Sequence, residues 1–318
     1  MENYFIDAEN YFIDMGKNSK KFRYLSVIKD NLFFLTSFQL NFKFVKVFNL
    51  IMDSNSAKQL LSETKKFLSK LPDLNEIISY GQKHKKVQIL PDDLSYINVY
   101  MSEDIDVDEG ACILLPDEFN NYICAETTAD GNCLYNAVSY FLIQEDLLST
   151  QLRLSTVLEL MAYANEYLKL EVFEKDYSYS DQAFSNANSK KYKQLEYRNI
   201  APFVAEVMSM CRIGAWSPLG ALYGLASVLE RPIQSIYPPI NSSILRSFTR
   251  IIKPRQQKYD IAIAVLWSVA GINETKAKKL LSSEYFVPNH FVGCYLKVFI
   301  LFNYTSILNV IYLYLNNY

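Results

Sequence analysis

The pattern of apolar and polar positions divides the chain into helical and extended stretches. Apolar residues recur every three or four positions in several stretches, which predicts amphipathic helices that bury one face. Other stretches are short and either continuously apolar or rich in β-branched and aromatic residues, which predicts strands. Because helices and strands interleave, we expect a mixed α/β architecture in which helices flank a small mixed sheet. The predicted helices cover residues 57–71, 133–142, 151–170, 200–211 and 219–229, and the predicted strands cover residues 122–126, 233–237, 261–267 and 290–296.

A turn-forming tripeptide precedes the second of these helices. Asp130, Gly131 and Asn132 favour tight turns and left-handed backbone angles, so Cys133 is predicted to begin the helix. At the start of a helix, the helix dipole and free N–H groups favour a thiolate, and the same N–H groups can hold an oxyanion. Cys133 is therefore a candidate nucleophile, and a structural cysteine buried in the core is the alternative.

A cysteine nucleophile needs a base, and the chain contains two histidines. His84 lies in the lysine-rich residues 83–86, where neighbouring positive charge disfavours the imidazolium. His290 begins the last predicted strand, at 290 − 133 = 157 residues from Cys133. Catalytic cysteine and histidine are usually distant in sequence and neighbours in space. His290 is therefore the candidate base, and a hydrogen-bonded core histidine is the alternative.

These residues belong to a pattern that is known from one protease family. The chain resembles the ovarian-tumour (OTU) class of papain-like cysteine proteases, as a divergent member. The resemblance spans about residues 118–297 and implies the OTU fold for this region. Its motifs, in the order of the family, are residues 130–135 (DGNCLY), 152–154 (LRL), Trp216, 231–237 (RPIQSIY) and 289–292 (NHFV).

The resemblance implies a thiol protease that acts as a deubiquitinase. Cys133 would attack the carbonyl carbon of a ubiquitin or ubiquitin-like conjugate, His290 would move the protons, and Asp130 would assist. The backbone N–H groups of Gly131 and Asn132 would hold the oxyanion. The expected partner is ubiquitin or a ubiquitin-like protein, and neither a metal nor an organic cofactor is expected.

One position departs from the family pattern. Many members carry Asn or Asp two positions after the histidine, to orient its imidazole, and here that position is Val292. Asp130 is then the expected orienting residue, with Asn289 as the alternative, although Asp130 could instead only cap the turn before the helix. An unoriented histidine is a poor base. The alternative function is therefore a catalytically inactive OTU-like fold that serves as a protein-interaction module.

Composition narrows the cellular setting. The chain has 32 lysines and arginines against 34 aspartates and glutamates, and this balance gives no reason to expect nucleic-acid binding. Its five cysteines show no C-x-x-C spacing, which argues against zinc ligation and a disulfide framework. The first residues are acidic and aromatic, unlike a signal peptide. We expect a reducing cytoplasmic or nuclear location.

The remaining segments are expected to flank one catalytic domain. An acidic run at residues 102–110 is predicted to be a solvated linker. Residues 298–315 carry no charge and just reach transmembrane length, so tail-anchored membrane association is one alternative, beside a poorly ordered extension or a packed strand pair. The predicted divisions are an N-terminal extension of uncertain order at 1–52, a helical and linker region at 53–117, the OTU-like domain at 118–297 and an uncharged hydrophobic tail at 298–318.

Overall fold

The computed structural model describes residues 54–85, 97, 99, 106–170, 200–240, 247–283 and 286–297. All of these residues belong to one compact unit. The predicted extension at 1–52 and tail at 298–318 lie outside the described residues, so the expected divisions of the chain stay predictions. In the part that the structure describes, no helix is long and apolar enough to cross a membrane.

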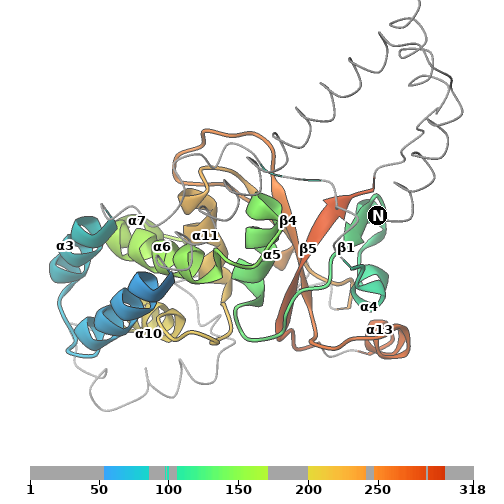
Figure 1. The fold of residues 1–318 in the computed structure, drawn as a ribbon, viewed down its shortest axis with the longest axis horizontal. Coiled ribbons are helices and arrows are strands. Elements are labelled where there is room, and N and C mark those ends of the chain that lie inside the picture. The colour runs from blue at the N-terminus through green and yellow to red at the C-terminus, as the bar shows by residue number, and fades with distance from the viewer. Residues whose placement is uncertain are drawn as a thin grey trace, which may run out of the picture. The chain divides into compact units, whose positions relative to one another are not determined.

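A five-stranded mixed sheet runs through the described unit (Figure 1). Its strand order is β1-β5-β4-β2-β3, in which β2 and β4 are parallel and the other neighbours are antiparallel. Strand β4 is buried along its whole length, as its continuous apolar run predicts for a strand covered on both faces. The predicted mixed sheet flanked by helices is confirmed. The strands are β1 (Tyr122–Cys124), β2 (Ile233–Ile236), β3 (Arg250–Ile252), β4 (Ile263–Ser268) and β5 (His290–Leu296).

Helix α5 (Cys133–Ile143) packs against β5 and β4, and aromatic rings fill the contact. The rings of Phe141 and Tyr295 stack with their centroids 4.3 Å apart. Gly293 lies beside both rings. A Cβ atom there would come within 3.1 Å of the Phe141 ring and 3.3 Å of the Tyr295 ring, so a residue without a side chain lets the helix approach the strand. This packing fixes the start of α5 relative to β5.

The helical half of the molecule is built around α6 (Ser149–Ala162), which contacts α3, α5, α10 and α11. The continuous helix predicted for residues 151–170 is wrong, because Tyr163 leaves the helical conformation (φ −124°, ψ 31°). The Tyr163 ring lies under the Arg255 guanidinium, 3.3 Å from it, and near the Lys85 ammonium. Residues 54–68 are also helical, and the other helices are α3 (Leu74–Lys85), α7 (Ala164–Tyr167), α10 (Ala201–Met210) and α11 (Leu219–Val228).

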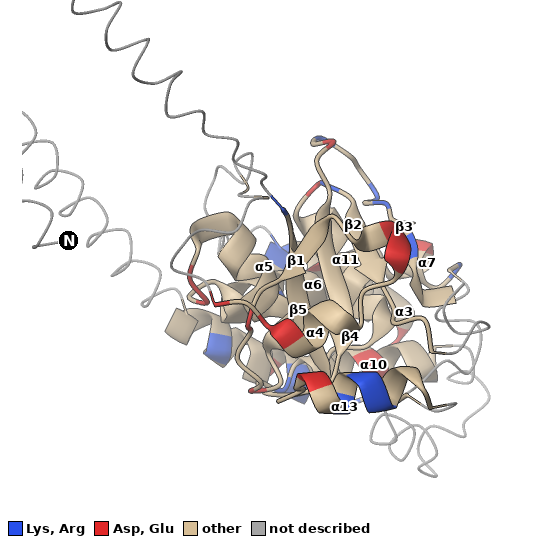
Figure 2. Ribbon diagram, turned by 90° about the vertical axis from the view of Figure 1, so that its right-hand side faces the viewer, with Lys and Arg blue, Asp and Glu red and all other residues tan. Residues whose placement is uncertain are grey.

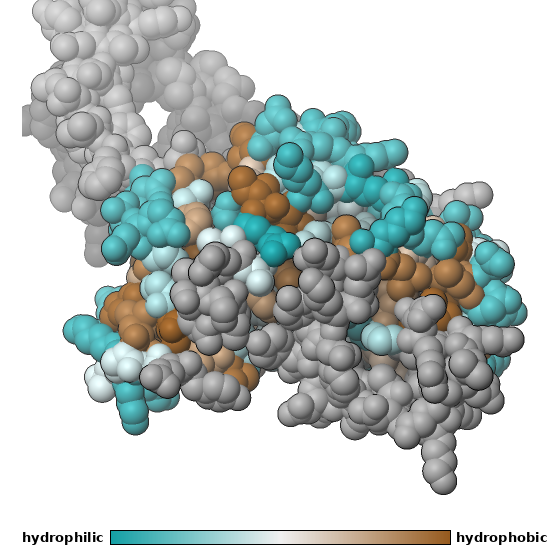
Figure 3. All heavy atoms as spheres, turned by 180° about the vertical axis from the view of Figure 1, so that it is seen from behind, coloured by the Kyte–Doolittle hydropathy of each residue, from teal (hydrophilic) through white to brown (hydrophobic). Residues whose placement is uncertain are grey.

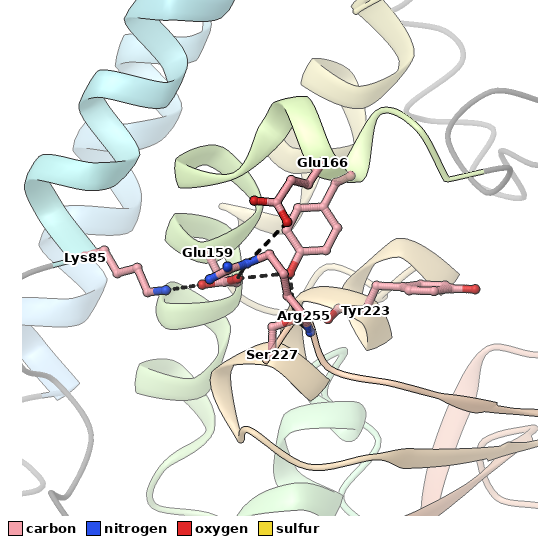
Figure 4. A network of polar contacts seen from close by, with 7 residues as sticks. Lys85, Glu159, Glu166, Tyr223, Ser227 and Arg255 are labelled. Carbon is pink, nitrogen blue, oxygen red and sulfur yellow. Dashed lines mark hydrogen bonds and ion pairs between the residues drawn. The ribbon is translucent and has the colours of Figure 1, made fainter. Parts of the chain in front are cut away.

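A buried carboxylate joins these helices (Figure 4). Glu159 on α6 is fully buried and forms ion pairs with Lys85 on α3 and with Arg255, whose Nε lies 3.1 Å from Oε1. The Tyr167 hydroxyl also donates to Glu159 and lies 2.8 Å from the Ser227 hydroxyl on α11. Because a buried charge needs partners, this network ties four helices together at one point.

Two short helices that we did not predict, one of them at the end of the expected acidic linker, pack against each other. Asp108 caps α4 (Glu109–Ile113), because its carboxylate accepts from the Ala111 N–H at 2.8 Å. Helix α4 packs against α13 (Glu274–Leu281), which Asn273 caps in the same way. The acidic run was read as a solvated linker, and this prediction is wrong for residues 106–110. A single 3-10 turn, η1 (Asp117–Phe119), leads from α4 to β1.

Apolar side chains also remain at the surface, and Figure 3 shows some of them among polar ones on the rear face. Ile251 on β3 is 57% exposed, and β3 is an edge strand of the sheet. Scattered exposed hydrophobic residues are normal for a folded protein. The large hydrophobic side chains that are most exposed within the described ranges are Val107, Ile213, Ile251, Ile261 and Val287.

Candidate active site

The turn before α5 is held by the Asp130 carboxylate. Its Oδ1 accepts from the Asn132 backbone N–H at 2.7 Å and from Nδ2 of Asn136 at 3.0 Å, and its Oδ2 accepts from Nδ2 of Asn132 at 3.0 Å. Gly131 adopts φ +81°, and a Cβ atom there would lie 1.9 Å from the Gly214 carbonyl oxygen. Only glycine fits this position. The carboxylate thus has the turn-capping contacts that we had weighed against an orienting role.

A buried arginine on α6 forms hydrogen bonds to the same turn. The Arg153 side chain is fully buried and donates four hydrogen bonds. Two reach the turn itself, at the Gly131 carbonyl (2.8 Å) and at Oδ1 of Asn132 (3.0 Å). The other two reach the carbonyl groups of Met210 (3.1 Å) and Ala215 (2.8 Å). Arg153 therefore has a structural role in holding the turn.

Helix α5 begins at Cys133, and its sulfur lies against the strand that carries His290. The Cys133 Sγ accepts from the backbone N–H of Phe291 at 3.3 Å. In the β5/β4 register Phe291 pairs with Trp267, and Trp216 stacks on the Phe291 ring at 5.8 Å. The structure therefore brings the candidate nucleophile next to the residue that follows the candidate base.

Burial keeps the Cys133 thiol protonated in this state. The side chain is 1% exposed, and desolvation raises its pKa to about 11. Hydrogen bonds from the N–H groups of Phe291 and Leu134 act in the opposite direction, as does the positive charge of Arg153, while the Asp130 charge raises the pKa further. The start of α5 was expected to favour a thiolate, and here desolvation outweighs it.

His290 lies at the start of β5 with its imidazole enclosed. The residue is 3% exposed, and burial lowers its pKa, while a hydrogen bond to the Thr127 backbone and the charge of Asp130 act against this shift. Nδ1 is buried and has no hydrogen-bond partner among the described residues.

The expected orienting side chains are engaged elsewhere. Asp130 holds the turn, and Oδ1 of Asn289 accepts from the Ala270 N–H at 2.9 Å. Val292, two residues along β5 from His290, is fully buried and cannot hydrogen-bond through its side chain. The backbone of Thr127 is therefore the group that holds the imidazole in this arrangement.

Ser268 is a further polar side chain beside the imidazole, and sequence reasoning missed it. It pairs directly with His290 in the β4/β5 register, is fully buried, and its hydroxyl has no partner in the described ranges. Asn132 and Asn136 were also missed as supports of the turn. Their spacing of four residues, which places two side chains on one side of a helix, was the available signal.

The backbone donors near Cys133 differ in availability. The Asn132 N–H, one of the expected oxyanion donors, is bound to Asp130. The N–H groups of Gly131 and Cys133 have no acceptor within the described part of the chain. They are thus the donors that remain for a developing oxyanion. Among the described residues, no group of three or more His, Cys, Asp or Glu side chains is arranged to hold a metal ion.

One known family model matches part of the chain. Residues 124–268 match the family described as the OTU domain of Vertnin, and the match includes Asp130 and Cys133. This part of the chain is similar to the OTU domain of Vertnin. The matched range ends before His290, so the similarity rests on the nucleophile turn and the strands up to β4.

Vertnin sequences from several vertebrates are similar to this chain. Bovine Vertnin is 30% identical over 192 residues, which cover 58% of this chain and 28% of the bovine protein. Human Vertnin is 29% identical over 192 residues, covering 58% and 26%, and zebrafish Vertnin is 29% identical over 148 residues, covering 44% and 21%. The similarity thus spans about a quarter of the length of these relatives.

Two solved OTU domains are also similar in structure. The OTU domain of OTUD1 has a TM-score of 0.32 and 16% identity, covering 58% of this chain and 97% of that domain. The viral OTU domain protease from Farallon virus has a TM-score of 0.31 and 14% identity, covering 61% and 99%.

Proposed function

We propose that this OTU domain is a cysteine isopeptidase that hydrolyses conjugates of ubiquitin or a ubiquitin-like protein. The observation that carries the proposal is the contact between Cys133 and the strand of His290, through the hydrogen bond from the Phe291 N–H to the sulfur. In this proposal the buried Cys133 thiol at the start of α5 is the nucleophile, and the buried His290 imidazole with its free Nδ1 at the start of β5 is the base.

The reaction follows the chemistry of a cysteine acyl transfer. Nδ1 of His290 removes the thiol proton as the Cys133 sulfur attacks the carbonyl carbon at the end of the conjugated tail, and the oxyanion forms near the Gly131 and Cys133 N–H groups. The intermediate collapses when the imidazolium gives its proton to the leaving lysine amine. Water, deprotonated by the same imidazole, then cleaves the thioester and restores the thiol. No metal or organic cofactor takes part.

The electrostatics favour proton transfer during attack over a preformed ion pair. The Cys133 pKa is raised to about 11 and the His290 pKa is lowered, so both groups are neutral at neutral pH. Thr127 orients the imidazole through its backbone, in the place of the side chain that Val292 lacks. The reduced thiol that this chemistry needs fits a cytoplasmic or nuclear location.

A ubiquitin with an electrophile at its C-terminus tests the proposal. Folded, reduced protein should gain one ubiquitin on Cys133, and Cys133→Ala should abolish the product. Cys112→Ala is the matched control, because Cys112 is a partly exposed thiol on α4, and it should label as wild type does. The absence of labelling at Cys133 under conditions in which an active OTU protease labels would overturn the proposal.

A non-catalytic interaction module is the second candidate, and the neutral, buried thiol together with Val292 favours it. It predicts that the protein binds ubiquitin or another ubiquitin-like protein without cleaving a conjugate. Binding would then be unchanged in both Cys133→Ala and His290→Ala. Labelling of Cys133 at a useful rate would exclude this candidate.

A further inference from the structure

The acidic segment before α4 is fixed beside the turn that leads to Cys133. Its backbone continues the pairing of β1: the Asp108 N–H donates to the Cys124 carbonyl at 2.9 Å, and the Glu126 N–H donates to the Asp106 carbonyl at 2.8 Å. Val107 and Ala125 form an isolated antiparallel bridge between these bonds. The carboxylates of the segment are therefore held in place along the chain that connects β1 to the nucleophile turn.

This segment forms one wall of a cleft of about 810 Å³. The opposite wall is the loop before α13, and the two walls meet where Gly110 packs on Ile272. A Cβ atom on Gly110 would lie 2.6 Å from the Ile272 carbonyl oxygen, so the glycine permits this close approach. The lining consists of residues 106–110, 126–129 and 271–274 with Tyr140 and His290.

The cleft is strongly negative. Five carboxylates line it, and neither lysine nor arginine is among its lining residues. Glu274 is paired with Lys278, whereas the other four form no ion pair within the described part of the chain. Figure 2 shows acidic residues on α4 and at the start of the neighbouring α13. Burial raises the pKa of Asp108, and repulsion from Glu126 adds to the rise, so the charges oppose one another.

The imidazole of His290 lies in the wall of this cleft. It is 97% buried, since only 3% is exposed, and its Nδ1 has no hydrogen-bond partner among the described residues. Cys133 does not line the cleft. The cleft therefore leads to the group that moves protons, from a direction different from that of the sulfur.

We propose that this cleft binds a positively charged peptide segment, and that in the reaction it holds the lysine-bearing side of the substrate. Only the second claim, that the cleft holds part of the substrate, rests on the proposed function. A lysine- or arginine-rich segment neutralises the four carboxylates that have no ion pair, and the residues that flank the linked lysine lie in this cleft beside His290 while the leaving amine stays at the sulfur. Acidic or neutral segments gain no such attraction.

Binding of a fluorescent lysine- and arginine-rich peptide to the full chain tests the cleft without any ubiquitin. The peptide should bind at low salt, weaken as salt rises, and exceed a length-matched serine and glutamine peptide in affinity. Asp106→Asn combined with Glu126→Gln, both at exposed lining positions, should weaken binding about tenfold, from about threefold per carboxylate. Asp117→Asn with Glu118→Gln, on η1 outside the cleft, is the matched control and should bind as wild type.

The outcomes separate this inference from the proposed function. Equal affinity of the two peptides, or equal loss in both double variants, would overturn the cleft proposal even if Cys133 labels with the ubiquitin probe. Peptide binding that depends on Asp106 and Glu126, in a protein whose Cys133 never labels, would support the cleft and reject the isopeptidase. For an active enzyme, the lining variant should raise KM more than it lowers kcat for conjugates with a basic segment around the linked lysine.

Discussion

Replacing Arg153 by methionine tests how the candidate site is supported. The guanidinium donates to four oxygen atoms, on Asn132, Met210, Gly131 and Ala215, at 2.8 to 3.1 Å. A buried acceptor left without a donor costs about 1–3 kcal/mol. At the lower end, four acceptors give about 4 kcal/mol, which is in the range measured when one partner of a buried charged network is removed. We expect Arg153→Met to lower the free energy of unfolding by about 4 kcal/mol.

Urea unfolding measures this change as a shift of the midpoint at constant slope. Arg250→Met is the matched control, because Arg250 is exposed on β3 and makes one bond to the Tyr223 hydroxyl, so its loss should cost about 0.5 kcal/mol or less. Arg153→Lys keeps the charge but not the forked donor and should fall between the two. A loss below about 1 kcal/mol for Arg153→Met, with the slope unchanged, would refute the view that this side chain holds the turn before Cys133.

Two further predictions concern the backbone and the imidazole. Gly131→Ala should lower the free energy of unfolding by about 3 kcal/mol or more and abolish labelling of Cys133, since the new Cβ atom meets the Gly214 carbonyl oxygen at 1.9 Å and the φ of +81° adds about 1–2 kcal/mol. Gly271→Ala is the control, because Gly271 has φ +61° but no atom within 4 Å of the new Cβ, so in the same urea titration it should show only the cost of the backbone angle. Because burial lowers the His290 pKa, the unfolded chain binds a proton at this histidine more readily than the folded chain does. The contribution of neutral His290 to the free energy of unfolding is therefore fully present above about pH 6.5 and is lost as the pH drops below that value. Urea unfolding between about pH 7.5 and pH 5 should therefore show a larger acid loss in wild type than in His290→Gln, and parallel curves would contradict the assigned burial.

The elements that carry the site were predictable because their signals are local. Asp130 and Gly131 are turn formers, apolar spacing follows Cys133, and a β-branched and aromatic run follows His290. The partners of Asp130 were not predictable, because a carboxylate can reach either a nearby N–H or a distant imidazole, and only the packing of α5 decides between them. The role of Thr127 was hidden for the same reason, since it acts through its backbone.

The missed elements have a common cause as well. Helix α4 is five residues long and acidic, so neither its length nor its apolarity separates it from a linker. Its signal was the cap, Asp108 before a short run with Ala111, which is weak without a following apolar stripe. The break at Tyr163 has no glycine or proline to mark it. It depends on two cations that lie beside the ring from other parts of the chain.

Backbone groups make several of the contacts that hold this site in place, so its side chains can differ from the family pattern. The Phe291 N–H binds the sulfur, the Thr127 backbone binds the imidazole, and the Gly131 carbonyl accepts from Arg153. A side chain at each of these positions can change while the contact persists, as long as the strand and the turn keep their places. Replacement of an orienting side chain by Val292 then removes one hydrogen bond without moving the strand, because the valine fills a fully buried position opposite Leu266. The arrangement of Cys133 and His290 is thus set by how α5 packs on β5, which glycine at position 293 permits, more than by the side chains around the imidazole.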